Sequence, residues 1–341
     1  MSDQAVLISP EEAVNLYRHD PNQLIARADR IRRSVFGPQV YVRGLIEFTN
    51  VCAANCHYCG IRRDNGGVRR YRMDEDAILN VIGRGIQEGI KTFVLQGGED
   101  PEWTTSRLCR LVERIRGDYG HEAAVTLSCG LRPLEDYRLL KASGADRYLM
   151  RFETSDPALH RRLRNGMSLE SRLEGLYALK EAGFEVGSGY MTGLPGETEE
   201  IRINNALLCR ELGLDMVGIG PFIPHPDTPL AGSVQENLSL AVKGTALLRL
   251  LLPNANIPAT TAAGSLEPDG REQMLAAGAN VLMPNITPVD HKKDYLLYPG
   301  KICLDESGFE CVGCLSLRVK TVGLSLSFDR GDSPAFSGRS A

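Results

Sequence analysis

The chain has 341 residues, of which 43% are hydrophobic, and this length suits two ordinary domains or one large α/β barrel. The 39 lysines and arginines are balanced by 43 acidic residues, so the formal net charge is −4 and gives no basic excess for nucleic-acid binding. The first residues carry acidic side chains and no apolar signal segment, and no apolar run is long enough to cross a membrane. We therefore expect a cytoplasmic protein without nucleic-acid or membrane partners.

The N-terminal part of the chain, residues 1–39, is expected to be a helical extension. Ser9 is suited to cap a helix and Pro10 to occupy its first position, so the pattern predicts a helical region over residues 9–34.

A helix–glycine–strand pattern then repeats along the chain. Five segments end a helix-like run with a glycine and continue into a short apolar run: "IQEGIKTFVLQ", "LKASGADRYLM", "LKEAGFEVGSG", "CRELGLDMVGI" and "MLAAGANVLMP". Glycine commonly closes a helix in the left-handed conformation, and a continuous apolar run is typical of a strand buried on both faces. The pattern therefore indicates repeated βα units.

Eight strands and seven intervening helices can be placed in this way. The expected strands are 40–49, 92–96, 123–129, 147–153, 186–192, 216–222, 256–261 and 281–284. The expected helices are 74–88, 105–117, 134–143, 168–182, 197–212, 239–252 and 270–277. This layout predicts a complete (β/α)8 TIM-type barrel over residues 40–290, with a doubly wound open sheet as the structural alternative.

The barrel pattern stops near residue 290. Residues 291–327 form a C-terminal extension that contains three further cysteines, and residues 328–341, "FDRGDSPAFSGRSA", are expected to be a disordered tail.

Three cysteines follow the first expected strand in "TNVCAANCHYCGIRR": Cys52, Cys56 and Cys59. Nine cysteines in a reducing compartment argue against a disulfide framework, so metal binding is the leading explanation for a cluster of them. In a barrel this position lies on the functional face. Zinc remains an alternative, but no fourth cysteine or histidine completes a closed site. An iron–sulfur cluster with one iron left open fits three thiolates.

The CX3CX2C spacing, with Tyr58 before the last cysteine, resembles the radical S-adenosylmethionine (SAM) enzymes. In that superfamily the open iron of a 4Fe–4S cluster binds SAM, and an electron from the cluster cleaves SAM to a 5′-deoxyadenosyl radical. The segment "VLQGGED" at 94–100 is similar to the superfamily's GGE motif, which holds the SAM amino group.

The chain further resembles the radical-SAM maturase of FeFe hydrogenase, the HydE family. The resemblance runs from about residue 40 to 315 and rests on segments such as "GLIEFTNVCAANCHYCGIRRDN", "DMVGIGPFIPHPDTPLA" and "NIPATTA". It implies a SAM site and a substrate cavity at the top of the barrel. The implied SAM residues are Tyr58, Gln96, Gly97, Gly98, Glu99, Glu153, Arg172 and Met216, and those lining the cavity are Thr126, Ser128, Arg151, Thr260, Thr261, Met283, Tyr295 and Tyr298.

Structural explanations stay open for several of these residues. Glu153 and Arg172 could form a salt bridge at the barrel rim, and Met216 and Met283 could be ordinary core residues. Thr260 and Thr261 are adjacent, so they cannot both point inward from a regular strand. The cavity residues could also be a satisfied polar layer of the core.

The second cysteine group, Cys303, Cys311 and Cys314, has the spacing CX7CX2C. It resembles an accessory cluster site found in part of the family, which implies a second 2Fe–2S or 4Fe–4S cluster. A zinc site or an empty site are the alternatives.

The resemblance implies that the adenosyl radical reacts at the sulfur of an iron-bound cysteine carbonyl/cyanide species during assembly of the hydrogenase di-iron centre. The implied partners are this small molecule, a one-electron donor such as flavodoxin or ferredoxin, and other hydrogenase maturases. A radical SAM synthase acting on an amino acid, similar to biotin synthase or methylornithine synthase, is the alternative among enzymes. A non-catalytic iron–sulfur or zinc scaffold is the alternative outside them.

Overall fold

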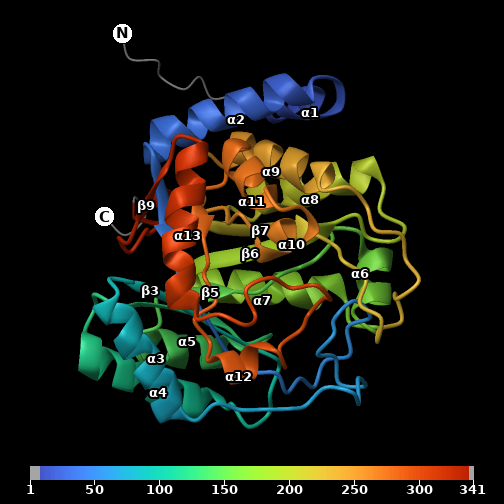
Figure 1. The fold of residues 1–341 in the computed structure, drawn as a ribbon. Coiled ribbons are helices and arrows are strands. Elements are labelled where there is room, and N and C mark those ends of the chain that lie inside the picture. The colour runs from blue at the N-terminus through green and yellow to red at the C-terminus, as the bar shows by residue number, and fades with distance from the viewer. Residues whose placement is uncertain (1–7, 338–341) are drawn as a thin grey trace.

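The computed structural model describes residues 8–337 (Figure 1). The strands are β1 Gln39–Val42, β2 Gly44–Thr49, β3 Thr92–Gly97, β4 Ala124–Ser128, β5 Arg147–Leu149, β6 Glu185–Thr192, β7 Met216–Pro221, β8 Val281–Leu282 and β9 Ser325–Ser327. The helices are α1 Pro10–His19, α2 Pro21–Phe36, α3 Glu75–Gln87, α4 Thr105–Tyr119, α5 Leu134–Ala142, α6 Pro157–Leu163, α7 Leu169–Glu181, α8 Glu199–Glu211, α9 Ser239–Leu251, α10 Thr261–Leu266, α11 Gly270–Ala276, α12 Val289–Lys292, α13 Gly308–Thr321 and α14 Pro334–Ser337.

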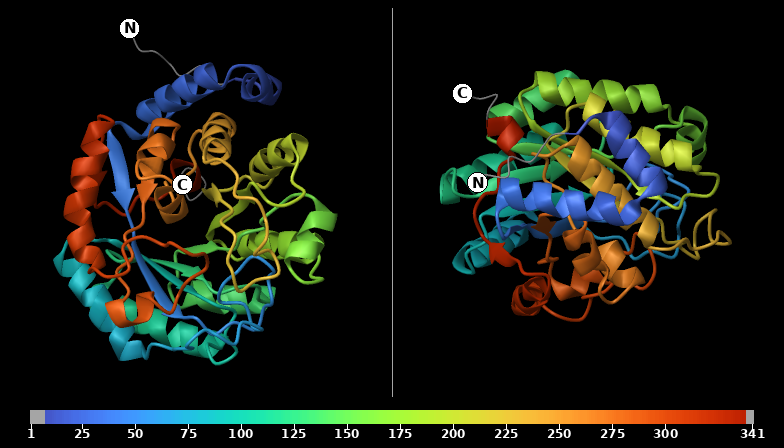
Figure 2. Two further views of the ribbon diagram at one scale, coloured as in Figure 1. Left: turned by 45° about the vertical axis from the view of Figure 1, so that its right-hand side comes forward. Right: turned by 90° about the horizontal axis from the view of Figure 1, so that it is seen from above.

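The strands form two parallel sheets, β8-β1-β9 and β2 to β7, that curl into a barrel surrounded by helices (Figure 2). Strands β2 to β7 pair in chain order, and β1 pairs with β8. Between β7 and β8 the ring continues through two isolated bridges, Met216 with Asn256 and Pro258 with Val281. The α/β barrel prediction is confirmed, and the open-sheet alternative is not what the structure shows.

The seventh expected strand, 256–261, is the least regular part of the ring. Pro258 has no N–H to donate to a ladder, and Thr260 already caps α10, where its hydroxyl accepts from the amide of Ala263. The expected strand, which included Thr260 and Thr261, is therefore replaced by a short extended segment followed by the helix α10.

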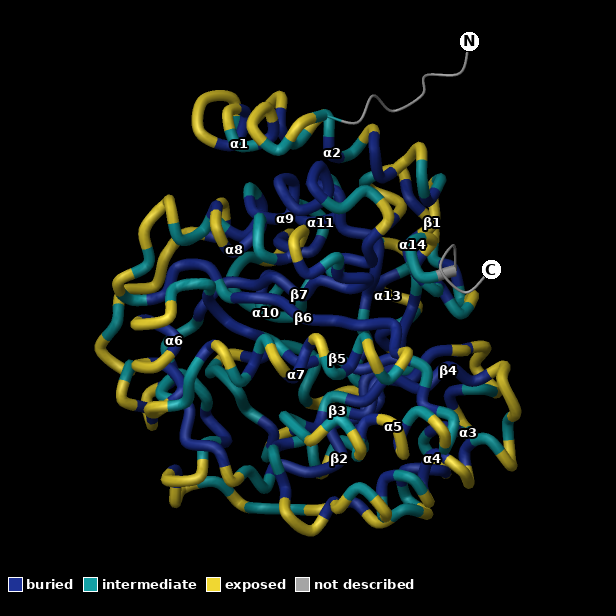
Figure 3. Tube along the Cα trace, turned by 180° about the vertical axis from the view of Figure 1, so that it is seen from behind, coloured by how far each residue is buried: buried dark blue, intermediate teal, exposed yellow. Residues whose placement is uncertain are grey.

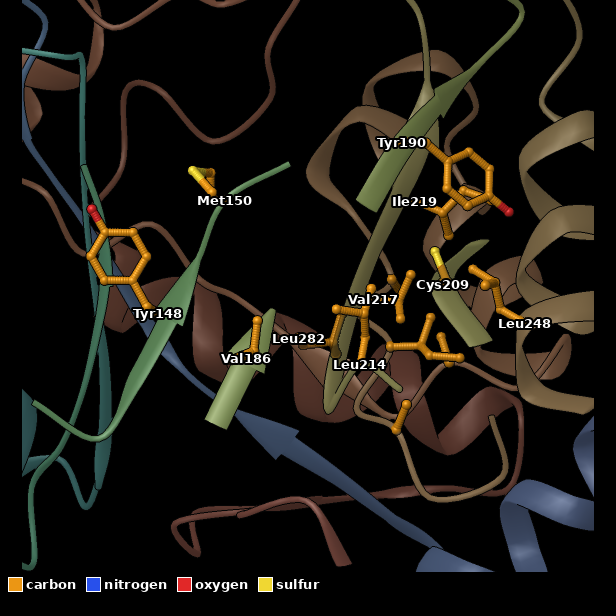
Figure 4. Close-up of a cluster of buried hydrophobic side chains, with 14 of the residues drawn as sticks. Tyr148, Met150, Val186, Tyr190, Cys209, Leu214, Val217, Ile219, Leu248 and Leu282 are labelled. Atoms are coloured by element: carbon orange, nitrogen blue, oxygen red, sulfur yellow. The ribbon is translucent and has the colours of Figure 1, made fainter. Parts of the chain in front are cut away.

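The core lies between the strands and the outer helices. In Figure 3 the central strands are buried while the outer faces of the helices are exposed. Tyr148, Val186 and Val217 lie on the strands, and Cys209 and Leu248 come from the covering helices, as Figure 4 shows for one cluster. Alternation along each strand then directs the remaining side chains into the barrel.

The C-terminal tail is ordered up to the last described residues, contrary to the prediction of disorder for 328–341. Strand β9 pairs with β1 at the start of the barrel wall, and the segment after it crosses the end of the barrel that holds the strand N-termini. The carbonyl of Gly331 accepts from Arg43 at 3.0 Å and from Asn256 at 2.9 Å. Arg147, fully buried, pairs with both Glu185 and Asp332. The polar composition of the tail suggested disorder, but its residues pair with buried charged side chains of the barrel, which would otherwise lack these partners. Residues 338–341 lie outside the described part of the chain.

The two N-terminal helices that the sequence predicts as an extension are present, with Ser9 as the cap of α1. Across the chain from residue 8 to residue 337, no helix combines the length and the apolar character that a membrane span requires.

Candidate active site

A cavity of about 280 Å³ opens at the C-terminal ends of the strands. Parallel pairing places Glu47, Gln96 and Ser128 side by side on β2, β3 and β4. Fifteen residues expected from the sequence contribute to the cavity wall: Cys52, Cys56, Tyr58, Cys59, Gln96, Gly97, Gly98, Glu99, Ser128, Arg151, Glu153, Arg172, Thr260, Tyr295 and Tyr298. The fold therefore brings together loops from most of the strands, as expected for the functional face of a barrel.

The first cysteine group lies on the loop that follows β2. Sγ of Cys52 accepts a hydrogen bond from the amide of Glu99 at 3.3 Å, and Sγ of Cys56 accepts from Nη1 of Arg164 at 2.9 Å. Burial raises the pKa of the Cys52, Cys56 and Cys59 thiols, and the charge of Arg164 opposes this effect at Cys56. Three free thiols thus lie on one cavity wall. The amide of Glu99 and the guanidinium of Arg164 can donate hydrogen bonds to two of these sulfur atoms when they are thiolates.

The GGE segment packs directly on the cysteine loop. A Cβ on Gly98 would lie 2.2 Å from the carbonyl oxygen of Val51 and 2.8 Å from Cβ of Cys52. Only glycine allows the two strand ends to approach this closely.

The carboxylate of Glu99 lies between two buried arginines. Its Oε1 is 3.1 Å from Nη2 of Arg164 and 3.5 Å from Nη2 of Arg172. Arg172 is 4% exposed and Arg164 is 8% exposed, so both charges depend on partners inside the site.

Glu153 follows β5 in a left-handed backbone conformation, with φ of 67°. Such a conformation is uncommon for glutamate and persists only where the surroundings impose it. Its carboxylate accepts from the hydroxyl of Tyr58 at 3.3 Å and lies 3.1 Å from Nε of Arg151. The rim salt bridge between Glu153 and Arg172 is therefore not formed: Glu153 pairs with Arg151, and Arg172 with Glu99.

Several buried polar atoms at this site have no hydrogen-bond partner within the described chain. They are Nε and Nη2 of Arg151, Oε2 of Glu153, Nε of Arg164 and Nη2 of Arg172. Three of them, Nε of Arg151, Oε2 of Glu153 and Nη2 of Arg172, lie within 3.5 Å of an ion-pair partner but make no directed hydrogen bond to it. Buried polar groups are normally hydrogen-bonded, so this set of atoms fits a polar ligand. Arginine N–H groups suit a carboxylate and glutamate oxygens suit an ammonium or hydroxyl groups, so the wall fits SAM beside a cluster held by three cysteines.

A buried ion pair supports the wall of the cavity. Nζ of Lys301 lies 2.6 Å from Oε1 of Glu47, and Oε2 of Glu47 accepts from Asn285 at 2.7 Å. Lys301 also donates to the carbonyl of Tyr295, whose hydroxyl accepts from Gln96 at 3.3 Å. This network orients Tyr295 and Gln96 toward the cavity.

Four expected residues do not reach the cavity wall. Thr126 precedes Ser128 by two residues, so it faces the same side one layer deeper, where it is buried. Met216 begins β7, and its sulfur accepts from Arg43, which also holds the tail segment. Thr261 opens α10, and its hydroxyl accepts from Arg271 at 3.3 Å. Met283 follows the two-residue strand β8 and is half-buried away from the wall.

Among the cavity-lining residues that sequence reasoning missed, Met191 and Arg164 carry the chemically most informative side chains. Met191, near the end of β6, lines the cavity and belongs to the same small hydrophobic cluster as Tyr58. Arg164 follows the short helix α6, which the sequence analysis did not predict. The Asp156–Pro157 start of α6 was a usable helix signal, but no spacing rule relates Arg164 to a cysteine 108 positions earlier.

The second cysteine group is only partly assembled. Sγ of Cys311 is 3.5 Å from Sγ of Cys303 and 3.7 Å from Oε1 of Glu306, and these three residues could hold one metal ion. Cys311 and Cys314 lie three residues apart on α13, but Cys314 is exposed. The hydrogen bond from Cys311 lowers the pKa of Cys303, and the same bond raises that of Cys311.

Comparisons with known proteins agree with this geometry. The model of the radical SAM superfamily matches residues 46–209. The [FeFe] hydrogenase maturase subunit HydE of Thermotoga maritima is 47% identical over 94% of this chain and 92% of its own length. The 3-methylornithine synthase of Methanosarcina acetivorans is 31% identical over 84% of this chain and 78% of its own length. A crystal structure of methylornithine synthase superposes with a TM-score of 0.81 at 25% identity, covering 94% of both chains.

The superfamily match and the 47% identity to HydE over 94% of the chain together make it a radical SAM enzyme, a superfamily that uses a 4Fe–4S cluster and SAM. Its barrel, its cysteine loop and its similarity along nearly the whole length to a hydrogenase maturase agree, and the chain belongs to the HydE family of radical SAM enzymes.

Proposed function

We propose that this enzyme acts in FeFe-hydrogenase maturation on the sulfur of an iron-bound cysteine carbonyl/cyanide species. When bound, the cluster and SAM supply a 5′-deoxyadenosyl radical by reductive cleavage of SAM. The convergence of the cysteine loop, the GGE segment and the arginines Arg151, Arg164 and Arg172, whose N–H groups are not all hydrogen-bonded, on one cavity carries this proposal.

The residues of the chain divide the binding of SAM between them. Cys52, Cys56 and Cys59 would hold the cluster, with SAM bound beside it. Glu99 accepts from the SAM ammonium group, and Arg172, 3.5 Å from Glu99, binds the carboxylate. An ammonium and a carboxylate on one carbon match a glutamate and an arginine that are already in contact.

The opposite side of the cavity would receive the rest of SAM and the substrate. Glu153 and Tyr58 offer oxygen atoms for the ribose hydroxyls. Ser128, Thr260, Tyr295 and Tyr298 add hydroxyl groups around Arg151, a lining that suits an anionic ligand carrying a carboxylate and cyanide groups.

The partners follow from the same proposal. A one-electron donor such as flavodoxin or ferredoxin would reduce the cluster in the cytoplasm, and other hydrogenase maturases would supply the substrate and use the product. Cys303, Cys311 and Cys314 would bind a second 2Fe–2S or 4Fe–4S cluster, with Glu306 beside it.

Anaerobic reconstitution followed by reduction with SAM present tests the enzyme reaction. We expect four irons at the first site and release of 5′-deoxyadenosine, both lost in the Cys56→Ala variant. Failure of the wild-type enzyme to release 5′-deoxyadenosine would refute the proposal.

The second candidate is a synthase that rearranges an amino acid, since 3-methylornithine synthase is 31% identical to this chain. The two are separated by their products. An adduct of the adenosyl group with cysteine sulfur, formed from an iron–cysteine substrate, supports the maturase reaction. A rearranged amino acid without that adduct supports the synthase.

A further inference from the structure

Arg164 occupies a position that none of the roles above explains. It follows α6, away from the GGE segment and the cysteine loop in sequence, yet its two terminal nitrogens contact one residue of each. Nη1 donates to Sγ of Cys56 at 2.9 Å, and Nη2 donates to Oε1 of Glu99 at 3.1 Å.

The guanidinium is fixed in this orientation by burial and by its planar shape. Arg164 is 8% exposed, and its backbone is tied to α6 by a hydrogen bond from its amide to the carbonyl of His160. The planar fork of arginine presents two terminal nitrogens in a fixed relation, so one side chain contacts Cys56 and Glu99 together, whereas the single nitrogen of a lysine is a less directed point charge. On the protein surface, water would screen the charge of such an arginine. Here solvent is largely excluded, so the positive charge of Arg164 acts strongly on the neighbouring Cys56 and Glu99.

The same contact has two consequences once Cys56 is a cluster ligand. Hydrogen bonds and positive charge at a cluster sulfur favour the reduced cluster, which carries one more negative charge, and so raise the reduction potential. The contact to Glu99 holds the carboxylate from one side. The closest contacts of Arg164 and Arg172 both go to Oε1, and a carboxylate has a second oxygen that can accept from an ammonium group.

We propose that Arg164 is a positioning residue that couples the cluster to the SAM amino-group site through its simultaneous contacts with Cys56 and Glu99. It raises the reduction potential of the cluster and fixes Glu99 for the ammonium group. This inference rests on the proposed function, because it requires the cluster to be held by the first cysteine group.

The test compares R164M and R164K with R161M in reconstituted protein. Arg161 lies on α6, shortly before Arg164 in the sequence, and is exposed, so R161M removes one positive charge nearby in the sequence without touching the cluster loop. Iron content and the melting temperature check that each variant folds. The midpoint potential is measured by a redox titration followed by electron paramagnetic resonance, with and without SAM, and SAM affinity by equilibrium binding.

We expect R164M to lower the midpoint potential enough to reduce the ratio of reduced to oxidised cluster at least tenfold at a fixed potential, which corresponds to about 59 mV for one electron. SAM affinity falls in R164M, and the losses in R164M and E99Q are not additive in the double variant, because both act on the same ammonium contact. R164K retains part of both effects, and R161M behaves as wild type.

A potential and a SAM affinity in R164M equal to those in R161M would overturn the inference while leaving the proposed function intact. Additive effects of R164M and E99Q on SAM affinity would also overturn it. R164K replaces R164M in the test if R164M does not retain its cluster. An R164K variant with the midpoint potential and SAM affinity of the wild type would then overturn the inference. A wild-type protein that takes up no cluster at the first cysteine group refutes the proposed function, and the inference fails with it.

Discussion

The amide of Glu99 donates a hydrogen bond to Sγ of Cys52 across 3.3 Å, which joins the loops that follow two neighbouring strands. The amide of Ala53 in turn donates to the carbonyl of Glu99 at 2.9 Å. The cysteine loop and the SAM-binding segment are therefore one rigid unit, and a change in either should be felt in both.

Gly98 lies at the centre of this unit, and Gly98→Ala should disrupt it. A Cβ would meet the carbonyl of Val51 at 2.2 Å, so the cysteine loop must move. We expect reduced cluster retention after reconstitution, measured as iron per chain, and weaker SAM binding. Gly66→Ala is the matched control, because Gly66 lies beyond the same cysteine loop with nothing within 4 Å of an added Cβ. Equal iron content in both variants would contradict this view.

The parts of the fold that follow local rules could be predicted from the sequence. Each βα unit shows itself through an apolar strand and a closing glycine, and Cys52, Cys56, Cys59 and Glu99 lie within short motifs. Met216 was expected at the SAM site but does not line the cavity, because it begins β7, and a residue's depth in a barrel depends on strand tilt and on the register of the neighbouring strands. The prediction of disorder after residue 327 failed for another reason. The polar residues of this segment pair with buried charged groups, such as Arg147, that are far away in sequence.

The buried pair of Lys301 and Glu47 provides a prediction about stability. Lys301→Met would leave the Glu47 carboxylate, whose side chain is 2% exposed, without its cation. Breaking a buried pair on one side typically costs about 3–5 kcal/mol of unfolding free energy. Denaturant unfolding of the cluster-free protein measures this cost.

Lys293→Met is the control for that prediction, because the Lys293–Asp305 pair is exposed. We expect it to leave the free energy of unfolding nearly unchanged, because solvent screens an exposed pair. Similar losses in the two lysine variants would show that the Glu47 pair is not effectively buried.

Gly331 is expected to be the critical residue of the C-terminal segment that crosses the barrel. It has φ of 61°, and an added Cβ would lie 2.6 Å from the ring of Tyr41. Gly331→Ala should therefore cost about 1–3 kcal/mol beyond the backbone strain, because the segment holding Arg43 must shift. Gly300→Ala isolates the strain alone, since Gly300 has φ of 67° and open space around it. Equal destabilisation of both variants would mean that the tail is not tightly packed.

His160 should make stability depend on pH near neutrality. Burial lowers the pKa of its imidazole below 6.5, while Nδ1 lies 3.2 Å from the carbonyl oxygen of Met167. At pH values between the folded-state pKa and 6.5, the unfolded chain binds more protons at His160 than the folded chain does. The free energy of unfolding therefore rises with pH in this window. The contribution of His160 to stability is lost as the pH falls through the same window. In His160→Asn this pH dependence should become shallower. An unaltered slope in the His160 variant would contradict the assignment.

Alanine at Cys303, Cys311 and Cys314 together should spare the reaction at the first cluster. None of the three lines the cavity, and the loop that carries Cys303 is held independently by Lys292, which donates to the carbonyls of Cys303 and Glu306. We expect the triple variant to lose the iron bound beyond the first cluster and to release 5′-deoxyadenosine at the wild-type rate, measured with iron and product in the same samples. Single alanine variants should rank the three cysteines by their importance for binding this iron. The loss should be larger for Cys311, whose sulfur is 3.5 Å from that of Cys303, than for the exposed Cys314. Loss of product in a triple variant that keeps its first four irons would show instead that the second site takes part in SAM cleavage.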